Sequence, residues 1–153
     1  MRRGVSFKIP NNYGTYLLEI LKPIELSRYM WFILGEESYT VRDDELSELL
    51  FHEPTVMDGE AFGDLISQDQ HYLIFLNLKA FPAGPVTDVE TYEAFLDSPC
   101  EFALLIVDST FVDIYCKNQR MIESFYDHAL SCEFKEVAYL TDANDMRTTL
   151  TIW

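Results

Sequence analysis

Basic residues are scarce in this sequence. It holds 11 lysines and arginines against 26 aspartates and glutamates, which gives a formal net charge of −15. Because phosphate backbones and anionic lipids repel a field of that sign, we expect no nucleic-acid partner and no binding to an anionic membrane surface. Two interpretations of the acidity stay open. It keeps the protein soluble, or it steers a basic partner or imitates a polyanion.

Cysteine is also sparse, and its three copies, Cys100, Cys116 and Cys132, form no C-x-x-C pair. An odd count without such a pair indicates neither a disulfide framework nor a zinc knuckle. Reduced, buried thiols in a cytoplasmic protein fit this usage. We therefore predict no metal site built on cysteine.

Long apolar runs are missing. The longest aliphatic and aromatic run, residues 102–107, is far too short to span a bilayer. The two arginines at positions 2 and 3 are not followed by an apolar segment, so the start of the chain does not look like a signal peptide. We expect a cytoplasmic protein.

Glycine-rich motifs are absent as well. The six glycines are scattered, and no P-loop, dinucleotide-binding fingerprint or G-x-S-x-G occurs. The common ways of cradling a phosphate or activating a serine are thus excluded, and we expect no cofactor.

What is present suffices for one folded domain, which we expect over residues 1–153. The chain is 48% hydrophobic and 14% aromatic, which argues against disorder despite the charge. A chain of this length can bury about 68–70% of its unfolded surface, so it needs no metal or disulfide for stability.

The segment 102–132 is predicted to form the centre of the core. An apolar run at 102–107, a polar break at 108–110, an alternating segment at 111–116 and a helical period at 118–130 predict strand, tight turn, strand and helix.

The same patterns predict the remaining elements. Strands are expected at 4–9, 29–34, 38–41, 72–81, 136–140 and 147–153, and helices at 13–21, 43–50, 88–97 and after the cap Asp58. Residues 35–37 are interpreted as a turn, 52–54 as a helix end and 82–85 as a rigid loop.

Strands and hairpins outnumber any regular strand–helix alternation. We therefore predict an α+β fold with a mainly antiparallel sheet and several hairpins, packed against amphipathic helices. One alternative stays open: strand 72–81, the following helix and strand 102–107 form a right-handed parallel crossover, which makes the sheet mixed.

Candidate catalytic side chains are few. None of the three histidines, His52, His71 and His128, sits in a metal-ligand or paired spacing. A triad of His71, Cys100 and Asp108 can be written, but nothing in the sequence brings these residues together. The catalytic residues stay unknown.

Two rows of carboxylates are interpreted as solvated faces of helices, because like charges at helical spacing repel and seek water. The rows are Asp43, Asp44, Glu45, Glu48 and Glu90, Glu93, Asp97, Glu101. A calcium loop starting at Asp58 is rejected, since Phe62 takes a position that needs an oxygen ligand. No metal is expected.

Several aromatic residues allow two interpretations. Strand positions favour core packing or cross-strand pairs, whereas exposure would make them interface residues. They are Tyr29, Trp31, Tyr39 and Trp153.

The opening residues MRRGVSFKIP, followed by YGTYLLEILKPI at 13–24, resemble the start of a family of short, acidic, uncharacterised proteins from Bacillus-type bacteria. The resemblance implies a bacterial cytoplasmic origin. It implies no activity, cofactor or site residue.

These observations favour a non-enzymatic interaction protein with a protein partner, for example an inhibitor of the immunity or antitoxin type. The alternative is an enzyme or small-molecule binder whose site is dispersed along the sequence, with His71, Cys100 and Tyr115 as candidates. A homo-oligomer formed through an edge strand, with Trp153 at the interface, stays open too.

Overall fold

One antiparallel sheet organises the chain. The computed structural model describes residues 1–52, 55–82 and 85–152. In chain order the elements are β1 (Arg2–Lys8), α1 (Tyr16–Ile20), η1 (Leu26–Arg28), β2 (Met30–Arg42), β3 (Glu45–Leu49), β4 (Thr55–Asp58), α2 (Gly59–Gln68), β5 (Gln70–Phe81), α3 (Tyr92–Asp97), β6 (Phe102–Val107), β7 (Phe111–Cys116), α4 (Gln119–Ser131) and β8 (Lys135–Thr141).

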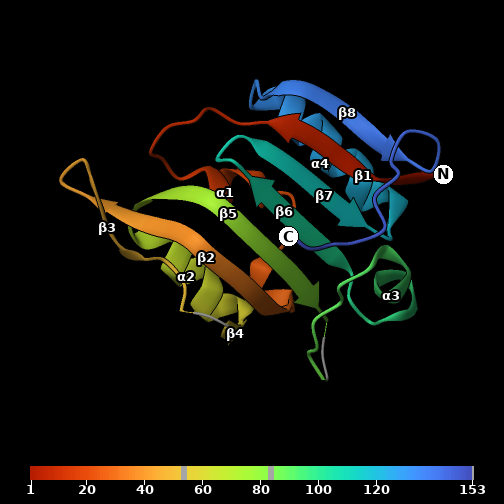
Figure 1. The fold of residues 1–153 in the computed structure, drawn as a ribbon, viewed down its shortest axis with the longest axis horizontal. Helices are drawn as coiled ribbons and strands as arrows, with labels where there is room; N and C mark the ends of the chain where they lie inside the picture. The colour runs from red at the N-terminus through yellow and green to blue at the C-terminus, as the bar shows by residue number, and fades with distance from the viewer. Residues whose placement is uncertain (53–54, 83–84, 153) are drawn as a thin grey trace.

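The strand order of the eight-stranded sheet is β3-β2-β5-β6-β7-β1-β8, and β4 pairs with β2 on the same side as β3 (Figure 1). The predicted α+β fold is confirmed. The parallel crossover is wrong, because β5 and β6 run antiparallel, with Leu76 opposite Ile106 and Ala80 opposite Phe102. The chain between them returns to the end of β5 that it left, where Glu101 N donates to Ala80 O at 2.9 Å.

The hairpin at the predicted centre of the core is confirmed. Phe102 pairs with Cys116 and Val107 with Phe111, and both strands are interior to the sheet. The turn residues Asp108 and Ser109 have φ of 53° and 62°, as the central residues of a type I′ turn do, and Thr110 N donates to Val107 O at 3.3 Å. Helix α4 follows, and Asn118 caps it by accepting from the backbone N–H groups of the first turn.

The hairpin predicted over residues 29–41 is wrong, because residues 30–41 belong to the single strand β2. The expected strand, turn and return strand over 29–41 form one continuous strand that pairs with β5 from Met30–Phe81 to Val41–Gln70. The register shifts between Leu34 and Ser38. A bulge therefore absorbs the residues that were interpreted as a turn, and the strand continues beyond it.

The helix predicted over residues 43–50 is also wrong, because strand β3 takes its place. The helix expected over 43–50 is absent, because Asp43 and Asp44 adopt φ of 54° and 61° and turn the chain back against β2. Aspartate tolerates this left-handed region better than most residues, and the free edge of β2 offers hydrogen bonds that a short helix could not match. The helical spacing of the leucines was misleading.

Smaller differences concern element ends and the C-terminus. Helix α1 is shorter than expected, and α3 begins only after its cap Thr91. The strand expected over 147–153 is wrong: the segment 146–152 makes one bridge, between Thr149 and Thr91, and otherwise crosses the sheet without pairing. Glu53, Pro54, Ala83, Gly84 and Trp153, which belong to predicted elements, lie outside the described residues.

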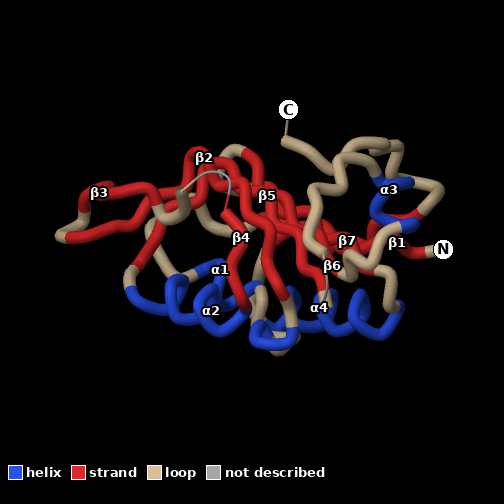
Figure 2. Tube along the Cα trace, turned by 90° about the horizontal axis from the view of Figure 1, so that it is seen from below, coloured by secondary structure: helices blue, strands red, loops and turns tan. Residues whose placement is uncertain are grey.

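Helices α1, α2 and α4 cover one face of the sheet (Figure 2). The core there is rich in rings. Trp31 is fully buried, stacks on Phe62 with centroids 4.5 Å apart and meets Phe102 edge-on at 5.9 Å. Its indole N–H donates to Leu26 O at 3.1 Å, so the polar end of the ring is satisfied.

The opposite face carries α3 and the C-terminal segment, and it holds a buried lysine. Lys79 has a side chain with no exposed surface, and its Nζ lies 2.6 Å from both Asn77 Oδ1 and Leu150 O. Asp88 Oδ1 lies 3.5 Å away and forms an ion pair with it. Burial lowers the pKa of Lys79, and Asp88 opposes that effect. The ammonium group of Lys79 thus holds two separate segments against β5, one that contains Asp88 and one that contains Leu150.

We expect Lys79→Met to loosen the C-terminal segment. The change removes the closer of two donors to Leu150 O, the other being Asn77 Nδ2 at 3.4 Å, and leaves Asp88 without its cation, so the free energy of unfolding should fall by about 3 kcal/mol. Urea unfolding measures that loss, and hydrogen exchange at the Leu150 amide, which donates to Glu90 O at 2.8 Å, measures the local loosening.

The double variant Lys79→Met/Asp88→Asn is the control. It should recover part of the stability, because the uncompensated carboxylate is gone. Unchanged stability and unchanged exchange in the single variant would show that the ammonium group does not hold this segment.

Candidate functional site

Charge is distributed unevenly along the chain. Residues 29–78 contain eleven of the 26 acidic residues and only one of the 11 basic residues, Arg42. This segment forms β2, β3, β4, α2 and most of β5, which lie together on one side of the molecule (Figure 1). We call this side the acidic end. A field of one sign over a whole side can steer an oppositely charged partner toward it.

The β2–β3 hairpin projects from the acidic end (Figure 1). All residues from Arg42 to Leu49 are exposed. The four carboxylates of the first acidic row lie on this hairpin, not on the helix that was expected. Among the described residues none of the four has an ion-pair partner, so their charge is available to a second molecule; they are Asp43, Asp44, Glu45 and Glu48.

The second acidic row is partly compensated. Glu93 and Asp97 lie on α3, while Glu90 and Glu101 flank it. Lys117 lies beside this row and donates to Ser98 O. Burial lowers the pKa of Lys117, and the charges of Glu101 and Asp97 act in the opposite direction. The hairpin is therefore the less compensated of the two rows.

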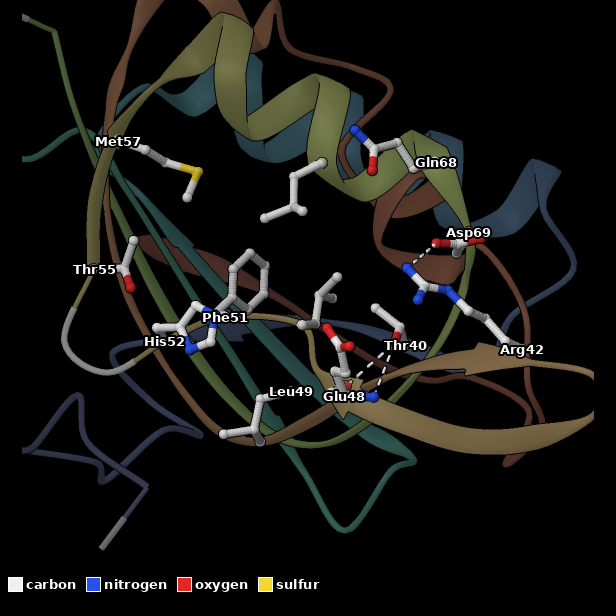
Figure 3. A pocket seen from close by; sticks show the side chains of 12 residues that line it. Thr40, Arg42, Glu48, Leu49, Phe51, His52, Thr55, Met57, Gln68 and Asp69 are labelled. Carbon is white, nitrogen blue, oxygen red and sulfur yellow. Dashed lines mark hydrogen bonds and ion pairs between the residues drawn. The ribbon is translucent and has the colours of Figure 1, made fainter.

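A cavity of about 260 Å³ lies between the base of the hairpin and α2 (Figure 3). Phe51, Met57 and Leu65 give it an apolar wall, while Glu48 and Asp69 are among its polar lining residues. In Figure 3 the Met57 side chain points into the space, Arg42 and Asp69 lie across from it, and Thr55 and His52 lie on the same side as Met57.

Two contacts fix the polar side of the cavity. Arg42 Nη2 lies 3.2 Å from Asp69 Oδ2, an ion pair whose side chains are 53% and 33% exposed. Thr40 Oγ1 donates to Glu48 O and accepts from Glu48 N, both at 3.2 Å. The backbone of Glu48 is thus held in place, while its carboxylate forms no ion pair within the part of the chain that the structure describes.

The three histidines lie in different surroundings. His52 lines the cavity. His128 Nε2 lies 2.6 Å from Glu19 O and 3.4 Å from Cys132 Sγ. His71 is 1% exposed, its Nε2 accepts from Leu17 N at 3.3 Å, and its Nδ1 is buried without a partner among the described residues. Burial lowers the pKa of His71 to about 4, so it is neutral at pH 7.

The structure does not assemble the triad. His71 bonds to α1 on the helix face, Cys100 is buried with Phe95 and Tyr115 on the opposite face, and Asp108 lies in the β6–β7 turn. Burial raises the pKa of Cys100 to about 11, so its thiol is protonated and unreactive. Of the three candidates for a dispersed site, only Cys100 and Tyr115 share a cluster.

Tyr115 has a structural partner. Its hydroxyl donates to Asp145 Oδ2 at 2.9 Å, which holds the segment after β8 against the sheet. Sequence reasoning missed both this contact and Lys79. The only signal for Lys79 was a lysine inside a strand with two apolar faces.

Two of the four candidate aromatic residues, Tyr29 and Trp31, belong to the core. Tyr29 and Trp31 are buried and Tyr39 is half-buried, while Trp153 lies outside the described residues. The rejected calcium-loop segment forms α2, where Asp58 Oδ1 accepts from Ala61 N at 2.8 Å. Over the described ranges, no helix is long and apolar enough to cross a membrane, and no group of three metal-ligating side chains is found.

Comparisons with known proteins cover nearly the whole chain. The profile of the family described as "Protein of unknown function (DUF2691)" matches residues 2–151. The "Uncharacterized protein YncE" of Bacillus subtilis (strain 168) is 47% identical over 153 residues, which is 99% of this chain and 100% of that protein. No solved structure matches the chain.

We expect the three thiols to react with iodoacetamide in a fixed order. Cys132 is half-buried, whereas Cys100 and Cys116 are buried and burial raises the pKa of both thiols. Peptide mass spectrometry at pH 7.5 should show modification of Cys132 first and of the other two only after unfolding in urea. Rapid labelling of Cys100 in the folded protein would restore it as a candidate nucleophile.

His71 should contribute to acid sensitivity. Its pKa falls from 6.5 to about 4 on folding, so below pH 6.5 the unfolded chain binds a proton that the folded chain does not. Stability is therefore lost as the pH falls. Between pH 7.5 and pH 5 the wild type should lose about 2 kcal/mol more than His71→Gln, which cannot titrate. Urea unfolding at each pH measures this, and equal pH dependence in both proteins would contradict it.

Proposed function

The chain belongs to the DUF2691 family, and for this member we propose a non-enzymatic role: it binds a basic protein partner through its acidic end. The observation that carries the proposal is the projecting β2–β3 hairpin. It combines four carboxylates that have no ion-pair partner among the described residues with a segment, 42–49, in which every residue is exposed.

The hairpin also offers apolar contact area. Leu46 is 44% and Leu49 38% exposed, and both lie among the carboxylates. Protein interfaces commonly place apolar anchors inside a charged rim, which gives affinity from burial and selectivity from charge. An isolated patch of solubilising acids has no need of exposed leucines.

A second copy of the chain is a poor partner for this surface. β3 is the edge strand of the sheet, and edge strands pair with other strands unless charge prevents it. Two such hairpins would bring eight carboxylates together, so the edge repels itself and attracts a basic strand or loop. An inhibitor of the immunity or antitoxin type would use a surface of this kind. The three free cysteines support a reducing, cytoplasmic setting.

The alternative function is small-molecule binding, with or without catalysis. The observation in its favour is the cavity of about 260 Å³ beneath the hairpin, which both apolar and polar residues line. It is slightly smaller than a typical pocket for a drug-sized ligand. A small metabolite that raises the melting temperature of the protein without any partner present would favour this alternative.

Affinity capture with matched variants tests the main proposal. The hairpin variant Asp43→Asn/Asp44→Asn/Glu45→Gln/Glu48→Gln removes four charges, and asparagine keeps the left-handed turn at 43–44. The control variant Glu90→Gln/Glu93→Gln/Asp97→Asn/Glu101→Gln removes four charges near α3. We expect wild type and control to retain the same stoichiometric protein from a lysate of the source bacterium, and the hairpin variant to lose it.

Salt provides a second readout. Because mobile ions screen exposed charges, the retained protein should elute as ionic strength rises from about 0.05 M to 0.5 M. An empty column with wild type at low salt, or equal capture by the hairpin variant, would contradict the proposal. Thermal melts should show that neither variant melts at a lower temperature than the wild type, which shows that a loss of capture is not a loss of folding.

A further inference from the structure

The cavity beneath the hairpin has the chemistry of a site for one kind of side chain. Its wall is apolar at Phe51, Met57 and Leu65, and its polar side carries the carboxylates of Glu48 and Asp69. A group that suits both surfaces has an apolar stem and a cationic head. Among protein side chains, only arginine and lysine have that form.

Arg42 already occupies part of this arrangement. It is the only basic residue in the segment 29–78, and its guanidinium lies 3.2 Å from Asp69 Oδ2 at the cavity. The ion pair is about half exposed on the arginine side, and exposed pairs contribute only about 0–1 kcal/mol. An incoming cation can therefore replace Arg42 at Asp69 at little cost, while Glu48 offers a second carboxylate, which forms no ion pair with any described residue.

We propose that this cavity binds an arginine or lysine side chain of the basic partner, with its stem against Met57 and Leu65 and its charged head at Glu48 and Asp69, in competition with Arg42. The inference rests on the proposed function, because it takes the partner's basic character from the acidic end. The inference adds a defined binding site for one side chain to the acidic end, whose binding was so far explained only by its negative electrostatic field.

The length of the stem separates this site from the general field. One probe is a blocked peptide that alternates four arginines with glycines. Its twin carries 2-amino-3-guanidinopropionate at each arginine, so the charge is the same and each stem is two methylenes shorter. If one arginine stem enters the cavity, the dissociation constant of the twin peptide should be about tenfold higher than that of the arginine peptide. The reason is that the shorter stem buries two methylene groups fewer on binding. Calorimetry at low salt measures both dissociation constants.

Two pairs of variants locate the effect. Asp69→Asn should weaken binding of the arginine peptide several-fold, whereas Asp64→Asn, the same change elsewhere on the acidic end, should have a smaller effect. Arg42→Gln should strengthen binding more than Arg28→Gln does, because only Arg42 competes for Asp69. The Met57 methyl resonance should shift on addition of the arginine peptide and stay nearly unchanged with the twin.

The outcomes distinguish this inference from the function on which it rests. Equal affinity of the two peptides, both lost in the hairpin variant, would overturn the anchor site and leave the acidic interaction surface standing. No binding of either peptide, or binding that the hairpin variant retains, would contradict both. Loss of peptide binding in Asp64→Asn equal to that in Asp69→Asn would also overturn the site, since only the field would then act.

Discussion

The pairing of β2 with β5 is the contact on which the rest of the structure depends. Ten residue pairs join the two strands, from Met30–Phe81 at one end to Val41–Gln70 at the other. β2 in turn provides the edge on which β3 and β4 form, and β5 carries Lys79, which fastens the C-terminal segment. The hairpin projects because β2 continues beyond the bulge between Leu34 and Ser38. Without that long ladder neither the acidic end nor its cavity would exist.

The negative charges of the acidic end favour binding of a basic partner but lower the stability of the free protein. The four carboxylates of the hairpin, which form no ion pair in residues 1–52, 55–82 and 85–152, repel one another, and neutral side chains there would raise stability. The fold tolerates the charges because residues 42–49 are exposed, where water screens the repulsion, while the rings of Trp31, Phe62 and Phe102 stabilise the core behind them. The repulsion is relieved when a basic surface binds, so charge that weakens the free protein can strengthen the complex.

Local chemistry made much of the fold predictable. The apolar run at 102–107, the polar break at 108–110 and the helical period at 118–130 predict a strand, a turn and a helix, and all three are present. Prediction failed where contacts with a segment far along the chain decide which secondary structure forms. Leucines at 46, 49 and 50 fit a helix until β2 offers an edge, and residues 147–152 alternate like a strand yet serve as a cover held by Lys79. The cavity was unpredictable for the same reason, since Glu48 lies on β3, Met57 on β4 and Asp69 between α2 and β5.

The central claim is that the acidic end, and the β2–β3 hairpin above all, is the surface that meets a partner. Hydrogen exchange resolved by peptide, with and without the captured protein bound, tests it most directly. The account predicts slower exchange at residues 42–49 and in the cavity lining around Phe51, where contact excludes water. Unchanged exchange at the hairpin, together with new protection around α3 or the C-terminal segment, would contradict it.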